Sequence, residues 1–174
     1  VEEFFQLFQV APLFLKQDAL MTETAIGLLM GYSGLIIFLT EMPIVNWLKG
    51  KYTIRRILIF GALLNALFFL ISALTVNHYW LYAAMTLMCL GEILVLPYTA
   101  TVTAMRAGKH NKGAYMGLNG LTFSVAFIIA PFLGTTTAAK FGYSTLWIGV
   151  TSGLVIAAFG FYFTTSKMIG DAKV

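Results

Sequence analysis

Long apolar stretches alternate with short polar connections along the whole chain. A helix needs roughly 20 predominantly apolar residues to cross the hydrocarbon core of a bilayer. A sixth stretch, residues 4–15, falls short of that length, because twelve residues correspond to only about 18 Å of helix. The pattern predicts an all-α, polytopic bundle of membrane helices. The five stretches that are long enough lie at about 25–45, 57–76, 79–102, 114–138 and 145–164.

Two glycine-rich segments that lie 86 positions apart follow one pattern. GLLMGYSGL at 27–35 and GAYMGLNGL at 113–121 share glycines at the first, fifth and eighth places, Met at the fourth and Leu at the ninth. This repetition indicates shared ancestry of the two parts of the chain. Each segment is also followed by a proline and a glycine with the same separation of eighteen residues, namely Pro43 with Gly61 and Pro131 with Gly149.

The repetition predicts two units, at about 1–76 and 79–166. With three spans each, the units enter the membrane from opposite faces, which is a device of secondary transporters. Plain duplication within a membrane scaffold is the alternative. The chain opens with Val1 rather than Met, and a copy of Tyr79 displaced by 86 residues would precede position 1. We therefore expect a truncated first helix and a fragment of a longer protein.

Composition excludes a soluble globule, since 59% of the residues are hydrophobic and only 10% are charged. The positive charges gather in alternate connections, and the positive-inside rule makes these connections and the C-terminus cytoplasmic. The net charge of +4 is thus a topology signal, and nucleic-acid binding is not expected. The basic residues are Lys49, Lys51, Arg55 and Arg56 in 46–56, Arg106, Lys109 and Lys112 in 103–113, and Lys167 and Lys173 in the tail.

Three segments carry a family resemblance: WLKGKYTIRR after the second span, LGEILVLP in the fourth and KGAYMGLNG opening the fifth. Together with the order of spans, they resemble the C-terminal six-helix half of a major facilitator superfamily transporter. The resemblance implies that residues 1–174 are such a half, in a bacterial cytoplasmic membrane. It also implies that the first, second, fourth and fifth spans line a cavity shared with a missing N-terminal half, and that the third and sixth are peripheral.

The family's cytoplasmic loop signature, G-x-x-x-D-(R/K)-x-G-x-(R/K)-(R/K), has a degenerate copy at 46–56. Lys51, Arg55 and Arg56 keep its basic positions, whereas Gly50 stands in place of the aspartate. The loop therefore lacks the acid on which a charge latch would depend. The basic residues of 46–56 are explained equally well as ordinary positive charge that sets the topology, with no latch.

Two carboxylates lie inside predicted spans, where an ionisable group is costly and needs an explanation. Glu92 is thirteen residues after Tyr79 and fourteen before Arg106, near mid-depth. We expect it to couple protons or to contact substrate, and a buried structural hydrogen bond is the alternative. Gly91, Glu92 and Pro97 resemble the acidic tenth helix of proton-coupled oligopeptide transporters and also occur in similar form in drug-efflux members.

Glu41 is only five residues before Asn46, near the cytoplasmic end of its span. We expect it to have a structural role, through an ion pair with the basic loop, and a coupling role is the alternative. It shares a helical stripe with small residues and Phe38, a face typical of close packing. The small residues are Gly27, Gly31 and Gly34.

Weaker candidates complete the predicted site. Gln6 is the counterpart of Glu92 at the offset of 86 and could face the same cavity. Other polar side chains could line the cavity, although such groups more often bond neighbouring helices. These are Tyr32, Tyr98, Thr99 and Asn119. No cofactor is predicted, and His78 and His110 fall in connections on opposite faces, which argues against a metal site.

The first functional hypothesis is proton-driven antiport of a small organic compound, of the drug-efflux kind. Proton-coupled uptake of a peptide or metabolite is the second. A non-transporting scaffold is a third, and an integral membrane enzyme is disfavoured because the sequence has no nucleophile motif and no clustered His or Cys ligands. The expected partners are a small-molecule substrate, protons, the lipid bilayer and the missing half.

Overall fold

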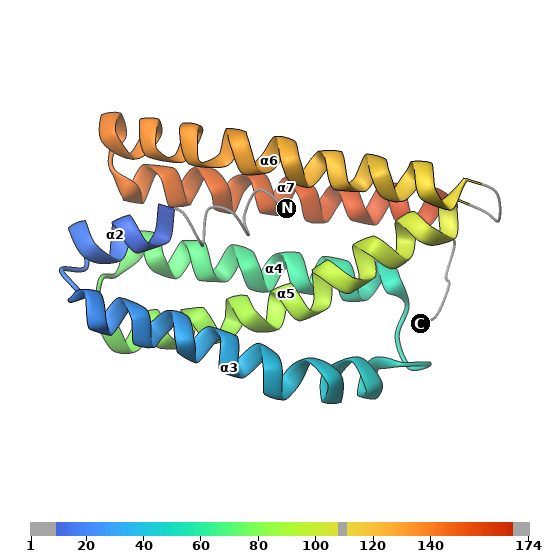
Figure 1. Ribbon diagram of the computed structural model, residues 1–174, viewed down its shortest axis with the longest axis horizontal. Coiled ribbons are helices and arrows are strands. Elements are labelled where there is room, and N and C mark those ends of the chain that lie inside the picture. The colour runs from blue at the N-terminus through green and yellow to red at the C-terminus, as the bar shows by residue number, and fades with distance from the viewer. Residues whose placement is uncertain (1–9, 108–110, 169–174) are drawn as a thin grey trace.

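Six helices make up the described part of the protein in a computed structural model, which describes residues 10–107 and 111–168 (Figure 1). No strand occurs within these residues, so the predicted all-α class is confirmed. The helices are α2 (Ala11–Gln17), α3 (Glu23–Leu48), α4 (Ile54–Leu74), α5 (His78–Arg106), α6 (Lys112–Phe141) and α7 (Tyr143–Met168).

The five long helices, α3 to α7, correspond to the five predicted spans and are long and apolar enough to cross a membrane, although α4 ends at Leu74, two residues before the predicted end of its span. The start of the short first stretch lies outside the described residues, and its end forms α2, with Pro12 in the first turn, where the missing N–H is not needed. Helices continue through Pro43, Pro97 and Pro131, so these prolines end no helix. Local chemistry at the helix ends matches these boundaries.

Short connections join the helices. The Thr22 side chain caps α3 by accepting a hydrogen bond from the Ala25 N–H at 3.3 Å, and the Asn77 side chain caps α5 through the Tyr79 N–H at 3.0 Å. Gly142 alone separates α6 from α7, and its φ of +83° is a conformation that glycine adopts without strain. Side-chain caps thus mark the starts of α3 and α5, and Gly142 marks the end of α6.

Helix α4 is the centre of the bundle. It packs along α5 on one side and α7 on the other, whereas α3 contacts α5 and α6 contacts α7 (Figure 1). Half of the apolar window of α4 and of α5 is buried, against 11% for α3 and 6% for α6. Helices α3 and α6 thus form the exposed edges of this assembly.

The close approach of α4 and α5 depends on two glycines. A Cβ added to Gly61 would lie 2.8 Å from Leu94 Cβ and 3.0 Å from the Gly91 carbonyl oxygen, and one added to Gly91 would lie 2.9 Å from the Gly61 carbonyl oxygen. The Asn65 side-chain oxygen also lies against Gly91. Small residues that let backbones approach are the main means by which helices associate in a membrane.

The glycines of the repeated motif behave differently. A Cβ added at any of them would meet nothing within 4 Å, so the packing face expected on α3 and α6 is not used within the described chain. Phe38, on the same stripe of α3 as Glu41, is also 80% exposed. The glycines of the repeated motif therefore face outward on both edge helices. Its glycines are Gly27, Gly31 and Gly34 on α3 and Gly113, Gly117 and Gly120 on α6.

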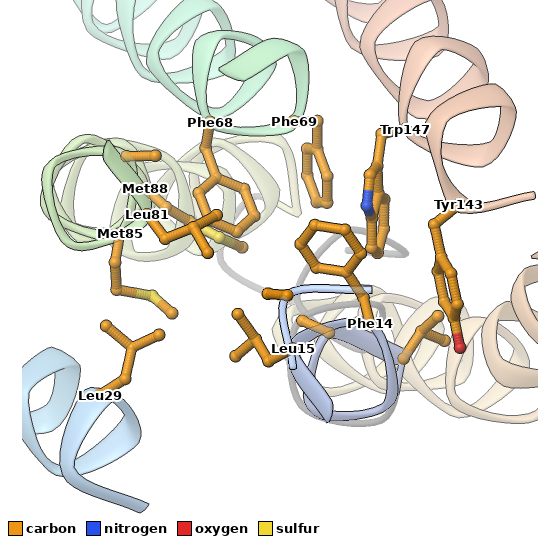
Figure 2. Close-up of a cluster of buried hydrophobic side chains, with 14 of the residues drawn as sticks. Phe14, Leu15, Leu29, Phe68, Phe69, Leu81, Met85, Met88, Tyr143 and Trp147 are labelled. Carbon is orange, nitrogen blue, oxygen red and sulfur yellow. The ribbon is translucent and has the colours of Figure 1, made fainter. Parts of the chain in front are cut away.

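A hydrophobic core joins α2, α3, α4, α5 and α7 at the end where α2 lies (Figure 2). Trp147 of α7 is its largest fully buried side chain, and its ring centroid lies 5.6 Å from that of Phe14 and 5.3 Å from that of Phe69. The Tyr143 hydroxyl donates to Gln17 Oε1 at 2.8 Å, which ties α7 to α2. Helix α2 is therefore an integral part of the bundle although it is short.

All basic connections gather at one end of the bundle. The α3–α4 loop, the end of α5, the start of α6 and the end of α7 lie there, and the other connections lie at the opposite end (Figure 1). This arrangement agrees with the alternation of charge in the sequence. That the basic end is cytoplasmic stays a prediction.

We expect Gly61→Ala to lower the free energy of unfolding by about 1–3 kcal/mol, because its methyl group would overpack the α4–α5 contact. The matched control is Gly149→Ala, its counterpart in the second unit, where a Cβ meets nothing within 4 Å. That control should lose no stability. Unfolding in mixed micelles, followed by circular dichroism, gives the free energy of unfolding of both variants. An equal loss in both would contradict the close contact between α4 and α5.

The topology prediction uses cysteine labelling in a Cys89→Ala background. Lys51→Cys and Lys112→Cys should react with a membrane-impermeant maleimide only from the cytoplasmic face, and Lys140→Cys only from the other face, because α6 separates Lys112 from Lys140. Labelling of Lys51→Cys and Lys140→Cys from the same face would exclude the inverted arrangement.

Candidate functional site

Glu92 occupies the centre of α5, as the fifteenth of its 29 residues, about 21 Å along the axis from either end. It is 5% exposed and shares a face of the helix with the fully buried Met85 and Met88. Among the described residues it is the only buried carboxylate. The structure therefore places a buried acid at the middle of a long apolar helix, on a face that it shares with buried apolar side chains.

The segment around Glu92 touches two other helices. Gly91 meets Asn65 and Gly61 of α4, and the Cys89 thiol lies 3.7 Å from the Ser33 carbonyl oxygen of α3, in position to donate to it. Glu92 thus lies where α5 is held from two sides. A carboxyl group in such a place can hold a proton when neutral and attract a cation when charged.

A second polar cluster lies between α3 and α5. The hydroxyls of Tyr32 and Thr86 are 3.0 Å apart, and the ring centroids of Tyr32 and Tyr82 are 5.4 Å apart in an edge-on arrangement. Tyr32 is 36% exposed, and Tyr82 and Thr86 are half-buried. The cluster therefore offers hydroxyl and aromatic groups at the surface of the bundle. Sequence reasoning named only Tyr32, although the spacing of four residues between Tyr82 and Thr86 places both on one face of a helix.

The other predicted polar residues are dispersed. Tyr98 is buried among apolar side chains at the basic end, and its hydroxyl has no hydrogen-bond partner in the described chain. The Thr99 hydroxyl donates to the Leu96 carbonyl oxygen at 2.9 Å, the local bond expected for a threonine within a helix. Asn119 is half-buried on the edge helix α6. Gln6 lies outside the described residues.

Glu41 does not form the expected ion pair. It is half-buried on α3, seven residues before Leu48, and no salt bridge joins it to a described residue. Two of the basic side chains face aromatic rings instead, with Lys51 Nζ 4.7 Å from the Trp47 ring centroid and the Arg55 guanidinium 5.3 Å from that of Tyr162. Cation–π contacts with nearby rings therefore replace the ion pair for these two cations.

The one salt bridge among the described residues lies at the opposite end, where Lys16 Nζ donates to Glu23 at 2.8 Å. This hydrogen bond and the charge of Glu23 raise the pKa of Lys16 above its usual value. The described residues contain no group of three or more His, Cys, Asp or Glu side chains able to hold a metal ion. The Glu92 carboxyl and the hydroxyls of the α3–α5 cluster are the candidate functional groups in the described part of the chain.

Comparisons with known proteins also indicate a membrane transporter. A Na(+), Li(+), K(+)/H(+) antiporter of Planococcus maritimus is 25% identical over 173 residues, which cover 91% of this chain and 40% of the relative. The chain thus spans less than half the length of that curated relative. No solved structure shows significant similarity. The family model of the Major Facilitator Superfamily matches residues 4–170, and the chain therefore belongs to that superfamily.

Proposed function

We propose that this chain is one half of a secondary transporter that exchanges protons for a monovalent cation, with Glu92 as the proton-exchanging group. The observation that carries the proposal is a carboxylate buried at the centre of a membrane helix. Ionisable groups at that depth commonly mark ion pathways and proton relays. Membership of a transporter superfamily and similarity to a proton antiporter support it.

The coupling follows from the cost of charge in an apolar environment. A neutral, protonated Glu92 is tolerated in the bundle, and so is a charged Glu92 that has a cation beside it. The other two combinations, a bare carboxylate or a cation beside a protonated acid, carry net charge and are disfavoured. The carboxyl O–H bond therefore breaks, and its proton leaves to water, when a cation enters. Exposure of the site to each side in turn makes the exchange directional.

An alkali cation is the first candidate for the cargo. The similar antiporter is named for Na(+), Li(+) and K(+), and carboxylate and hydroxyl oxygens are suitable ligands for such hard cations. A small organic cation, as in the drug-efflux hypothesis, is the second. The exposed Tyr32 ring and its neighbour Tyr82 favour it, because aromatic faces attract organic cations.

A second six-helix half is part of the proposal. The outward glycine faces of α3 and α6 offer small residues for close packing, and the similar antiporter is longer than the aligned region. A partner half on these faces would enclose a cavity between α3, α5 and α6, within a bacterial cytoplasmic membrane. The related units, one ending with α4 and the other comprising α5 to α7, would then provide the inverted repeat.

Glu92→Gln is nearly isosteric but cannot exchange a proton, so it should abolish cation-dependent dissipation of a pH gradient. The measurement is quenching of a pH-sensitive dye in everted vesicles that contain the complete transporter, after addition of Na(+), K(+) or an organic cation. The matched control is Glu41→Gln, a carboxylate of α3 that lies near the basic end. It should keep gradient dependence, with a lower folding yield at most.

The transport rate of each variant is normalised to the amount of inserted protein. Full gradient dependence in Glu92→Gln, together with its loss in well-folded Glu41→Gln, would show that the two roles are reversed. Residues 1–174 alone should insert and transport nothing. Robust gradient-driven flux by that chain would refute the two-half proposal, unless cross-linking reveals a homodimer.

The α3–α5 cluster distinguishes the two cargoes. Tyr82→Leu removes the aromatic ring beside Tyr32 and leaves the Tyr32–Thr86 hydroxyl pair in place. It should therefore raise the KM for an organic cation about fivefold and leave the KM for Na(+) unchanged. Thr86→Val removes the hydroxyl beside Tyr32 and should instead raise the KM for the alkali cation. Equal KM values for both variants and the parent protein, with both cargoes, would exclude the cluster from the transport path.

A further inference from the structure

A cavity of about 520 Å³ lies between α3, α4 and α5 at the basic end of the bundle. Its walls are aliphatic, with Ile44 and Leu48 from α3, Ile57 and Leu64 from α4, and Leu90 from α5. From Arg56 to Leu64 the cavity follows α4 for eight residues, about 12 Å of helix. It is therefore a narrow apolar space of the size typical of sites for small molecules.

The polar groups of this cavity lie at one end only. Trp47, Tyr52 and Arg56 line it where α3 ends and α4 begins. The Trp47 and Tyr52 ring centroids are 5.7 Å apart, and Lys51 Nζ lies over the Trp47 ring. Amphipathic rings beside cations are typical of the boundary between hydrocarbon and headgroups. The mouth of the cavity is thus both basic and aromatic.

The cavity opens toward a face suited to hydrocarbon. Phe60, which lines it, is 60% exposed and begins an exposed stripe along α4 that contains only apolar side chains. Such a stripe suits contact with acyl chains rather than with a water-filled pathway. The stripe continues through Leu63, Leu67, Leu70 and Leu74.

We propose that this cavity binds an anionic phospholipid. One acyl chain lies along the aliphatic walls, and the phosphate of the headgroup contacts Arg56 and Lys51. Charge complementarity decides this occupant: the connection 49–53 and the first turn of α4 carry four cations and no acid, and Glu41 pairs with none of them. Basic pockets between membrane helices are suited to such headgroups. Glu92 does not line the cavity, although Leu90 and Leu94 on either side of it do, and the proposal does not depend on the proposed transport cycle.

Native mass spectrometry of the purified chain in detergent tests the proposal, with phosphatidylglycerol and phosphatidylcholine of identical acyl chains as probes. Phosphatidylglycerol should be retained and phosphatidylcholine lost. Arg56→Gln should weaken phosphatidylglycerol binding about fivefold, whereas the control Lys140→Gln, at the other end of the bundle, should not. Leu90→Trp fills the cavity and should remove the bound lipid, and Leu133→Trp on the exposed face of α6 should not.

Because Arg56 is exposed, its substitution leaves the core intact, and the comparison of headgroups needs no substitution. Equal retention of the two lipids would overturn the proposal, as would full phosphatidylglycerol binding in Leu90→Trp that folds normally. Occupation by a protein segment would appear as a loss of all lipid together with a cross-link from Trp47→Cys to a second polypeptide. That outcome would also overturn it.

Discussion

Helices α4 and α5 cross where Gly61 and Gly91 bring their backbones together, and the other helices are arranged around that contact. Lipid is as apolar as the helix surfaces, so association within a membrane depends on close packing rather than on the hydrophobic effect. Substituting either glycine would insert a methyl group where neighbouring atoms already lie within 3 Å. The contact also places Asn65 against Gly91 and fixes the depth and direction of the next residue, Glu92. Helix α7 then packs on the far side of α4, and α3 packs on α5.

The position of the proposed coupling group follows from this arrangement. Glu92 is held on a helix that is packed from two sides, so its carboxyl would change charge in a fixed place, while α3 and α6 carry the exposed faces. Alternating access requires that one rigid body move against another around such a fixed site. The lipid proposed for the cavity beside Arg56 would occupy the space between α3 and α4 and would link that body to the membrane. The two proposals thus assign proton exchange and lipid binding to different parts of the chain.

Sequence reasoning predicted the five long spans, the grouping of the basic connections and the depth of Glu92, because each depends on local hydropathy and spacing. It failed for features that depend on contacts between helices. Gly61 and Gly149 are equivalent in the repeat, yet only Gly61 is crowded, since Gly61 is buried against α5 whereas Gly149 is exposed on α7. The expected ion pair of Glu41 is absent among the described residues, and two of the basic side chains, Lys51 and Arg55, lie over aromatic rings. The contact of Tyr32 with Thr86 could not be predicted, because it depends on how α3 is aligned against α5, and the sequence of one helix does not determine that alignment.

The central claim is that Glu92 exchanges its proton for a cation, and infrared difference spectroscopy tests it most directly. Spectra of the complete purified transporter would be recorded at constant pH before and after addition of Na(+) or an organic cation. Loss of the C=O stretch of a protonated carboxyl group on addition of the cargo, absent in Glu92→Gln and retained in Glu41→Gln, is the predicted result. An unchanged carboxyl band in a protein that binds its cargo, or the same change in Glu92→Gln, would contradict the account.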